Sequence, residues 1–333
     1  MFYAKTVWVV EGVFFSCIPP RRQRKGSPML KHGFLYNMKK YKLLYLMFLP
    51  TAAFLLVFNY APLWGLRMAF FNYIPWKGFE GSAFVGWQNF KTLFSLPDFS
   101  RLVTNTVVIN IYKILIGFPM PILFALLLNE IRSKKFKRTV QTISYLPHFV
   151  SWVIISAILY SLINGNYGLL NTFLINLGIA PPKWYIRPDL WRGLLVLTDI
   201  WKSVGFSSIL YLAAIANINT EMYEAAVIDG AGRLKQILYI TLPSILPTII
   251  VMFILSMGGM MNGNFQQIYS LVGSNTPLYK TVDVLDFAIY RRGMQRSEFS
   301  LATAMGIFQS GISFLLVVIT NKIANKAGEY GVW

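Results

Sequence analysis

Cysteine, histidine and acidic residues are scarce in this sequence, and each shortage narrows what the protein can be. Of its 333 residues, one is Cys, two are His and 13 are Asp or Glu. The single Cys17 excludes an internal disulfide, and two histidines leave no Cys/His metal cluster to predict. No stretch fits G-x-x-x-x-G-K followed by Ser or Thr, so nothing in the sequence cradles a nucleotide phosphate. No D-x-D occurs either.

Apolar residues are abundant instead. Hydrophobic residues make up 55% of the chain, charged residues only 13%, and the mean hydropathy is +0.51. These values predict a polytopic membrane protein that is surrounded by a lipid bilayer. The net charge of +18 would indicate a nucleic-acid partner in a soluble chain. Here it comes from the loops that flank the membrane, so no nucleic-acid partner is expected.

Six apolar runs come close to the ~20 residues that a helix needs to cross a bilayer. They predict an all-α fold of six transmembrane helices, at about residues 43–64, 103–128, 140–163, 194–216, 242–261 and 301–319. Six spans place both termini on one side and the longer loops, residues 65–102, 164–193 and 262–300, on the other. The sequence shows no Pro/Gly/Ser-rich linker, so residues 29–333 are expected to form a single transmembrane domain.

Lys and Arg set the orientation of these spans. With the N-terminus inside, the inner segments hold eighteen Lys and Arg and the longer outer loops hold eleven. The short loop 129–139 decides the matter, because five of its eleven residues are basic. Both termini are therefore predicted to be cytoplasmic.

Residues 1–28 match none of the usual N-terminal segments. The apolar stretch 7–18 is too short for a span, and its positive charges follow the apolar residues, whereas those of a signal peptide precede them. We interpret these residues as a cytoplasmic extension ahead of a possible start at Met29.

The inner loop at residues 217–241, called the elbow below, has a distinctive pattern. Thr220 can cap a short helix whose first turn carries Glu221 and Glu224, and the alanines that follow favour helix and leave a smooth face. Gly230 and Gly232 then break this helix. A second helix, at residues 233–242, is expected to run in a new direction up to Pro243.

Three charged residues fall inside predicted spans, Lys113 in the second and Asp199 with Lys202 in the fourth. A charge at mid-membrane costs ~2.5–3.5 kcal/mol on insertion scales, so it faces a cavity or another charge. Because Asp199 and Lys202 are three residues apart on a helix, they are expected to neutralise one another. Lys113 is the better candidate for a cavity, although it could also reach the interface or pair with a neighbouring helix.

A polar solute that passes between the spans would need amides or carboxylates for its polar groups and aromatic faces for its apolar parts. The outer end of the fifth span supplies this mixture, and other spans can contribute to it. The candidate substrate-pathway residues are Asn110, Tyr112, Lys113, Trp201, Asn262, Asn264, Phe265, Gln266, Gln267 and Gln309. The alternative is that these amides hold the helices together.

Aromatic residues are frequent in the outer loops, where they either anchor the chain at the membrane interface or form a docking surface for an external partner. They are Tyr73, Trp76, Trp87, Tyr167, Trp184, Tyr185 and Trp191.

Several motifs resemble one protein family. The elbow and the residues after it fit E-A-A-x(3)-G-x(9)-I-x-L-P, from Glu224 to Pro243, which is similar to the signature of binding-protein-dependent ABC import permeases. Residues 84–90 (FVGWQNF), 126–132, 141–149, 200–202 and 298–300 also look like stretches of carbohydrate-uptake permeases, in the branch for polysaccharides or oligosaccharides. The resemblance covers the chain from about Lys40 onward.

This resemblance implies a type I ABC importer permease in a bacterial cell membrane, which is a transporter subunit and not an enzyme. It implies a second homologous permease, a cytoplasmic ATPase dimer that carries ATP and Mg, and an extracytoplasmic solute-binding protein, with no cofactor or catalytic residue in this chain. The elbow would couple to the ATPase through Glu221, Glu224, Ala225, Ala226, Asp229, Gly230, Ala231 and Gly232.

Other functions stay open at this point. The solute could be a smaller sugar or glycerol phosphate, and a membrane-embedded sugar transferase is a different class. Such an enzyme would need paired acids, and Asp283 and Asp286 have no metal-like companions in the sequence. The basic residues Arg291, Arg292 and Arg296 favour either an acidic oligosaccharide or an acidic binding protein.

Overall fold

The computed structural model of the chain describes residue 36, residues 40–165 and residues 167–328. The predicted extension at residues 1–28 lies outside them. The chain divides near residue 67 into two compact units, and the larger unit, from Met68 onward, contains the site discussed below. The prediction of one domain over residues 29–333 stays a prediction.

Five helical segments are long and apolar enough to cross a membrane: Lys42–Phe70, Phe99–Glu130, Pro188–Ala216, Arg233–Gly258 and Phe299–Lys326. The first comprises α3 (Lys42–Leu55), η1 (Leu56–Tyr60) and η2 (Ala61–Phe70). The second comprises α5 (Phe99–Tyr112), η4 (Lys113–Gly117) and α6 (Pro119–Glu130), and the third is α10 (Pro188–Ala216). The fourth comprises α12 (Arg233–Gln236), η5 (Ile237–Thr241) and α13 (Leu242–Gly258), and the fifth is α17 (Phe299–Gly328). The predicted spans are therefore helical, with longer bounds than expected.

Three of these spans contain a π-helical turn that ends two residues before a proline. The turns are η1, η4 and η5, and the prolines are Pro62, Pro119 and Pro243. A proline lacks an N–H group and its ring clashes with the carbonyl four residues earlier. The wide turn, in which the Phe118 N–H reaches the Lys113 carbonyl at 3.0 Å, makes room for the ring. The expected second helix does begin at Arg233, and it runs on without a break into the fifth predicted span.

The third predicted span, at residues 140–163, is a bent pair and not one straight helix. α7 (Lys134–Phe149) and α8 (Trp152–Ile163) meet at an angle of 101°. Ser151 starts α8 by accepting a backbone N–H from its first turn at 3.3 Å. Lys202 on α10 donates to the carbonyls of Pro147 at 3.3 Å, His148 at 2.7 Å and Val150. The break therefore has partners for the carbonyls that the end of α7 leaves unpaired.

The loop after the first span contains a small sheet, which an all-α fold does not include. β1 (Phe71–Ile74) pairs antiparallel with β2 (Gly78–Phe84) around η3 (Pro75–Lys77), and α4 (Gln88–Phe94) follows. Asn89 donates to the carbonyls of Ala69 at 2.9 Å and Phe71 at 3.0 Å. The motif at residues 84–90 thus fastens this hairpin to the end of the span.

The other two long loops are also helical. α9 (Leu169–Asn176) lies between α8 and α10 in the chain; α14 (Phe265–Leu271), η6 (Thr276–Leu278), α15 (Tyr279–Val282), α16 (Leu285–Tyr290) and η7 (Arg291–Gln295) precede α17. Trp191 is completely buried in a core cluster and donates to the Trp184 carbonyl at 2.6 Å. It is neither an interfacial anchor nor a docking residue, whereas Trp76 is 83% exposed.

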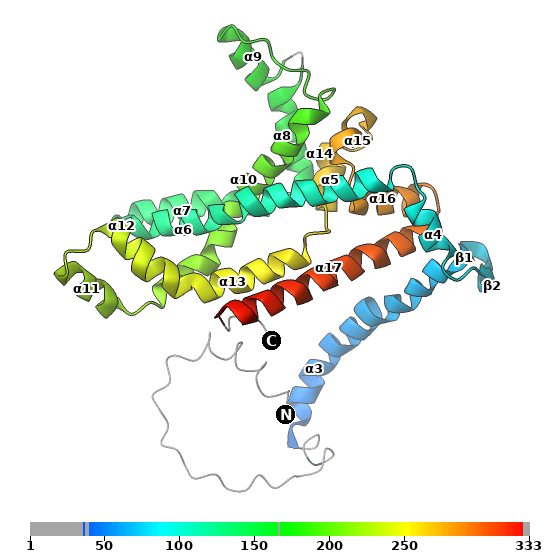
Figure 1. Ribbon diagram of the computed structural model, residues 1–333, viewed down its shortest axis with the longest axis horizontal. Helices are drawn as coiled ribbons and strands as arrows, with labels where there is room; N and C mark the ends of the chain where they lie inside the picture. The colour runs from blue at the N-terminus through cyan, green and yellow to red at the C-terminus, as the bar shows by residue number, and fades with distance from the viewer. Residues whose placement is uncertain (1–35, 37–39, 166, 329–333) are drawn as a thin grey trace. The chain divides into compact units, whose positions relative to one another are not determined.

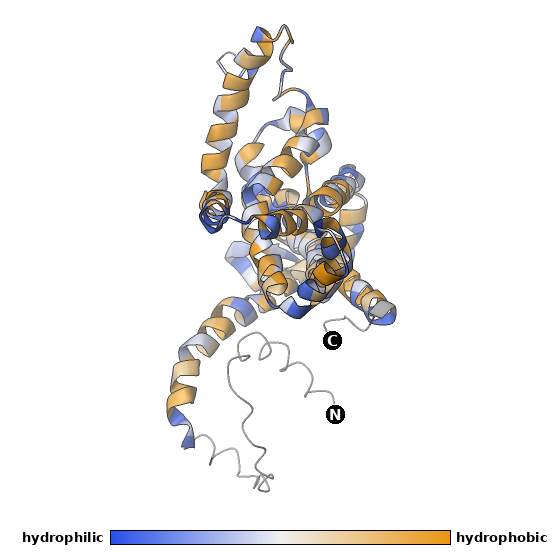
Figure 2. Ribbon diagram, turned by 90° about the vertical axis from the view of Figure 1, so that its left-hand side faces the viewer, coloured by the Kyte–Doolittle hydropathy of each residue, from blue (hydrophilic) through white to orange (hydrophobic). Residues whose placement is uncertain are grey.

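α10 is at the centre of the larger unit and packs against α6, α7 and α13, while α13 and α17 lie side by side (Figure 1). α7 and α10 approach so closely that a Cβ on Gly205 would lie 2.1 Å from the Ser144 carbonyl oxygen. Hydrophobic residues predominate along most of these helices (Figure 2). At most 22% of the residues in the apolar window of any of the five spans are buried, which leaves most of their surface for lipid or other subunits.

Candidate functional site

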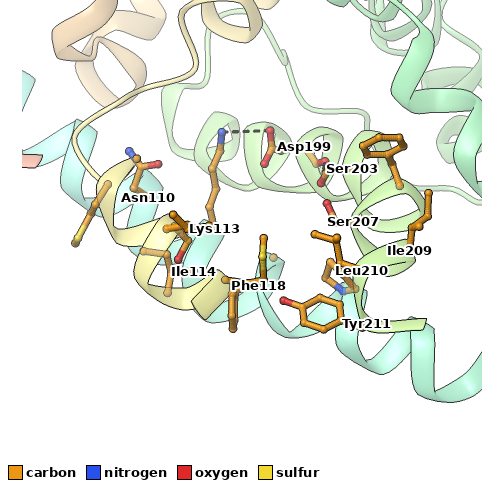
Figure 3. Close-up of a pocket in the computed structure, with 18 residues that line it drawn as sticks. Asn110, Lys113, Ile114, Phe118, Asp199, Ser203, Ser207, Ile209, Leu210 and Tyr211 are labelled. Carbon is orange, nitrogen blue, oxygen red and sulfur yellow. Dashed lines mark hydrogen bonds and ion pairs between the residues drawn. The ribbon is translucent and has the colours of Figure 1, made fainter. Parts of the chain in front are cut away.

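A cavity of about 540 Å³ lies between the segment α5–η4–α6, α10 and α13 (Figure 3). Its wall is mainly apolar, and its polar side chains are those of Asn110, Lys113, Asp199, Ser203, Ser207, Tyr211 and Ser256. Small-molecule sites typically measure ~300–1,000 Å³ and combine apolar walls with a few polar groups. The cavity has the size and composition of such a site.

Lys113 and Asp199 meet at one end of this cavity, with Lys113 Nζ 3.4 Å from Asp199 Oδ1 (Figure 3). Lys113 Nζ also donates to Gln267 Oε1 at 2.9 Å, and Asn264 Nδ2 donates to Asp199 Oδ1 at 3.2 Å. Lys113 is the first residue of the π-turn η4, a feature that is frequent at functional sites. Lys113 thus lines the cavity, as predicted, and it also pairs with a neighbouring helix, which was one of the alternatives.

The predicted pair of Asp199 with Lys202 was wrong. Although the two residues are three apart on α10, Lys202 is turned toward the carbonyls at the end of α7, and Asp199 takes Lys113 as its counter-ion. The choice follows from what each side chain can reach. The end of α7 presents backbone carbonyls to Lys202, and η4 places a second ammonium group, that of Lys113, next to Asp199.

Several of the predicted pathway amides join helices to one another. Asn110 Nδ2 donates to the Asn262 carbonyl at 3.1 Å, and Gln309 Nε2 donates to Asn262 Oδ1 at 2.9 Å. Gln267 is completely buried and its Nε2 donates to the Leu195 carbonyl at 2.7 Å. Of these, only Asn110 also lines the cavity.

The remaining predicted pathway residues are dispersed. Phe265 and Gln266 line a second cavity of about 450 Å³, together with Trp152 and Lys202. Tyr112 and Trp201 are 42% and 47% exposed and line neither of these two cavities. The predicted set thus does not converge on one cavity.

The cavity residues that were not predicted from the sequence include three on α10. Ser203, Phe206 and Ser207 line the wall at four, seven and eight residues after Asp199 on α10. This spacing places them on one face of the helix. A helical projection that starts from the charged residue within the span would have identified them.

The elbow contains the predicted short helix, α11 (Thr220–Ile228). Its cap is Asn219 and not Thr220, because the Asn219 side chain accepts the Glu221 N–H at 3.0 Å while Thr220 is already helical. Gly230 ends the helix with φ +75°, a conformation that disfavours any side chain. Tyr223 and Thr241 then share a hydrogen bond of 2.8 Å between their hydroxyl oxygens, which ties α11 to the start of the next span.

α11 and the turn that follows it present an exposed apolar surface. Among the predicted coupling residues, the structure leaves Glu221, Glu224, Ala225, Asp229, Gly230 and Gly232 exposed and Ala226 and Ala231 half-buried. Next to them on α11, Val227 is 63% exposed and Ile228 is 85% exposed. α11 also lies at the edge of the larger unit, away from α8 and α9 (Figure 1). Large apolar side chains that are this exposed outside the spans are typical of a surface that another protein covers.

Two of the three arginines in the last long loop have internal partners. Arg291 pairs with the buried Asp283 at 2.6 Å, and Arg292 pairs with Asp98 at 3.2 Å and Glu298 at 3.0 Å. Burial raises the pKa of the Asp283 carboxyl, and Arg291 opposes that shift. In residues 40–165 and 167–328, no group of three or more His, Cys, Asp or Glu is placed to hold a metal ion.

The profile of the family described as "Binding-protein-dependent transport system inner membrane component" matches residues 117–326, which is more than half of the chain. The chain belongs to this family. This permease is 40% identical to the polygalacturonan/rhamnogalacturonan transport system permease protein YteP of Bacillus subtilis (strain 168), over 90% of this chain and 92% of that protein. It is also 38% identical to Protein LplB of the same organism, over 93% of this chain and 98% of that one.

A solved structure agrees with this assignment. One chain of a bacterial alginate ABC transporter, in complex with an alginate pentasaccharide-bound periplasmic protein, matches with a TM-score of 0.82 and 38% identity, over 90% of this permease and 99% of that chain. The chain is thus the permease of a sugar ABC importer in the bacterial cell membrane. Its family is one of permease subunits, which lack a catalytic site of their own.

Proposed function

We propose that this permease forms half of the translocation pathway for acidic, uronate-containing oligosaccharides or polysaccharide fragments. One observation carries the proposal. Over nine tenths of its length the chain is similar to a permease for polygalacturonan or rhamnogalacturonan and to a subunit of a transporter for the acidic polysaccharide alginate. Polygalacturonan is itself a polymer of a uronic acid. The buried cation in the cavity, Lys113, supports the same substrate class.

The permease crosses the membrane six times in this proposal, with the bent pair α7 and α8 counted as one span and both termini in the cytoplasm. The elbow and the basic loop 129–139 then face the cytoplasm together. Arg233 of α12 lies 3.6 Å from Glu130 at the end of α6, which supports this placement because it joins two segments assigned to the same side.

The elbow couples the permease to a cytoplasmic ATPase dimer, which holds ATP and Mg. α11 seats against one ATPase subunit through its exposed face, which includes Glu224 and Ala225 and is flanked by Ile228. The second half of the pathway comes from a homologous permease, and an extracytoplasmic binding protein delivers the oligosaccharide. The exposure of the apolar side chains next to the E-A-A residues supports this docking.

Charge reversal at the elbow tests the coupling. We expect the ATPase to co-purify with the wild type and to be lost or uncoupled in Glu224→Lys and Gly230→Asp, because the first reverses a charge on the contact face and the second strains a residue at φ +75°. Glu80→Lys is the matched control, since Glu80 is exposed on β2 in an outer loop. A permease that purifies without any ATPase, with no effect of the elbow variants, would refute the coupling.

Uptake into proteoliposomes that contain the whole transporter tests the substrate class. Trigalacturonate and its methyl ester share one carbon skeleton and differ in charge, so their ratio reports recognition of the carboxylate. We expect the acid to be taken up in preference. Equal uptake of both would show that the carboxylate is not recognised and would indicate an importer of neutral oligosaccharides. Uptake of only monosaccharides or glycerol phosphate would favour the smaller-solute alternative.

A further inference from the structure

A partly buried ion pair that is loosely held lies in the cavity of this permease. The side chains of Lys113 and Asp199 are 13% and 27% exposed, and their closest charged atoms are 3.4 Å apart. A tight ammonium–carboxylate hydrogen bond measures ~2.7–2.9 Å. The pair therefore neutralises both charges without a short contact between them.

Lys113 keeps its position independently of Asp199. Its ammonium group donates to Gln267 Oε1 at 2.9 Å. Gln267 is in turn held by the Leu195 carbonyl at 2.7 Å and by Thr198 Oγ1 at 3.0 Å. This chain of hydrogen bonds joins α5, α14 and α10 and fixes the ammonium group at the cavity wall. If Asp199 moves away, Lys113 still points into the same place.

Asp199 has a second partner that could hold it after such a movement. Asn264 Nδ2 donates to its Oδ1 at 3.2 Å, and Ser203, one turn further along α10, lines the same wall. A buried carboxylate that loses one of its partners is costly unless another remains. Here the alternative partner is already in contact.

The cavity that surrounds the pair suits a sugar acid. Among the described residues that line it, Lys113 is the one cation and Asp199 the one anion. The hydroxyl groups of Ser203, Ser207 and Tyr211 lie on the same wall, next to apolar side chains such as Phe118. A pyranose ring can lie against the apolar part, while its hydroxyl groups meet the serines and its carboxylate meets the ammonium group.

We propose that Lys113 binds the carboxylate of the substrate in exchange for that of Asp199. The Asp199 carboxylate pairs with Lys113 until the substrate carboxylate replaces it. The inference rests on the proposed function, since it assigns a residue to the recognition of an acidic sugar. An uncharged sugar cannot replace Asp199, because it would leave both the ammonium group and Asp199 without a counter-charge. Specificity then arises because an acidic sugar supplies a counter-charge to Lys113, whereas an uncharged sugar leaves both Lys113 and Asp199 without one.

Equilibrium binding to the transporter in lipid nanodiscs tests the exchange, with the binding protein omitted so that it cannot select the ligand. The probes are trigalacturonate and its methyl ester, and the quantity measured is the ratio of their dissociation constants. Two variants are compared, Asp199→Asn and the double variant Lys113→Gln with Asp199→Asn. They differ only at Lys113, and neither leaves an unpaired carboxylate in the membrane.

Asp199→Asn is expected to bind the acid more tightly than the wild type does, because its competitor for Lys113 is gone. The double variant is expected to lose at least about tenfold of the acid-to-ester preference of Asp199→Asn, as one charge-assisted hydrogen bond requires. Lys113→Arg, which keeps the charge, should retain the preference. Lys135→Gln removes an exposed lysine on α7 and should match the wild type.

Two outcomes would overturn the proposal in different ways. If the wild type prefers the acid and the double variant keeps that preference, another group reads the carboxylate, and the proposed substrate class survives without Lys113. If the wild type itself does not distinguish the acid from its ester, the proposed substrate class fails, and the exchange fails with it.

Discussion

Lys202 is expected to hold the break between α7 and α8 in place. Its ammonium group is the shared donor for the carbonyls of Pro147, His148 and Val150. We predict that Lys202→Met, which keeps most of the aliphatic stem, lowers the thermal stability of the permease. The carbonyls at the end of α7 would then lose their partner in a membrane protein that offers few others.

The size of the effect can be worked from these contacts. Hydrogen bonds from a charged donor contribute ~1.5–3 kcal/mol each in soluble proteins, but measured values inside membrane proteins average only ~0.6 kcal/mol. Lys202 also lines the second cavity, where water can replace part of the loss. Three contacts together therefore amount to about 2–4 kcal/mol, or a decrease in Tm of roughly 3–6 °C for a chain of this size.

Thermal unfolding of the purified permease in nanodiscs measures this change. Lys135→Met is the matched control, because Lys135 is exposed on the same helix α7. Lys202→Arg should recover part of the stability, since its guanidinium group can still donate to several carbonyls. If Lys202→Met unfolds within about one degree of Lys135→Met, the ammonium group does not stabilise the break, and the argument from unpaired carbonyls is wrong.

Two further predictions concern close packing and buried charge, and the same unfolding assay measures both. Gly205→Ala is expected to destabilise the permease by ~1–3 kcal/mol, because the new Cβ would lie 2.1 Å from a backbone oxygen of α7. Gly193→Ala, on the same helix with nothing within 4 Å, should be neutral; equal effects of the two would disprove the close contact. Arg291→Ala should cost ~3–5 kcal/mol by leaving Asp283, which is 1% exposed, without its main partner. Arg187→Ala breaks only an exposed pair, and a comparable loss there would contradict the role of burial.

The sequence predicted the elements that depend on local composition. The spans were located to within a few residues of their helical cores, because about twenty apolar residues in a row have few other stable arrangements in a bilayer. The helix at Thr220–Ile228 and its end at Gly230 followed from helix propensity and from the conformational freedom of glycine. The choice of Lys113 as a cavity residue followed from the cost of burying a charge.

Other predictions failed where a residue has more than one possible partner. Asp199 was assigned to Lys202, three residues away, but pairs with Lys113 on another helix. Trp191 was assigned to a membrane interface or a docking surface, but is buried in the core. In both cases the residue type shows that the side chain needs a partner. It does not show which partner the fold brings within reach.

The amino-acid sequence by itself therefore determined that this is a membrane permease of helical spans, and that a short helix, α11, ends before Gly230. Tertiary structure alone decided that α7 and α8 bend by 101°, that Lys202 holds that bend, and that Lys113 and Asp199 meet in one cavity. The physical reason is the range of the forces. Hydropathy and helix propensity act over neighbouring residues, whereas the contacts from Lys202 to α7 and from Lys113 to Asp199 join residues that are more than fifty positions apart.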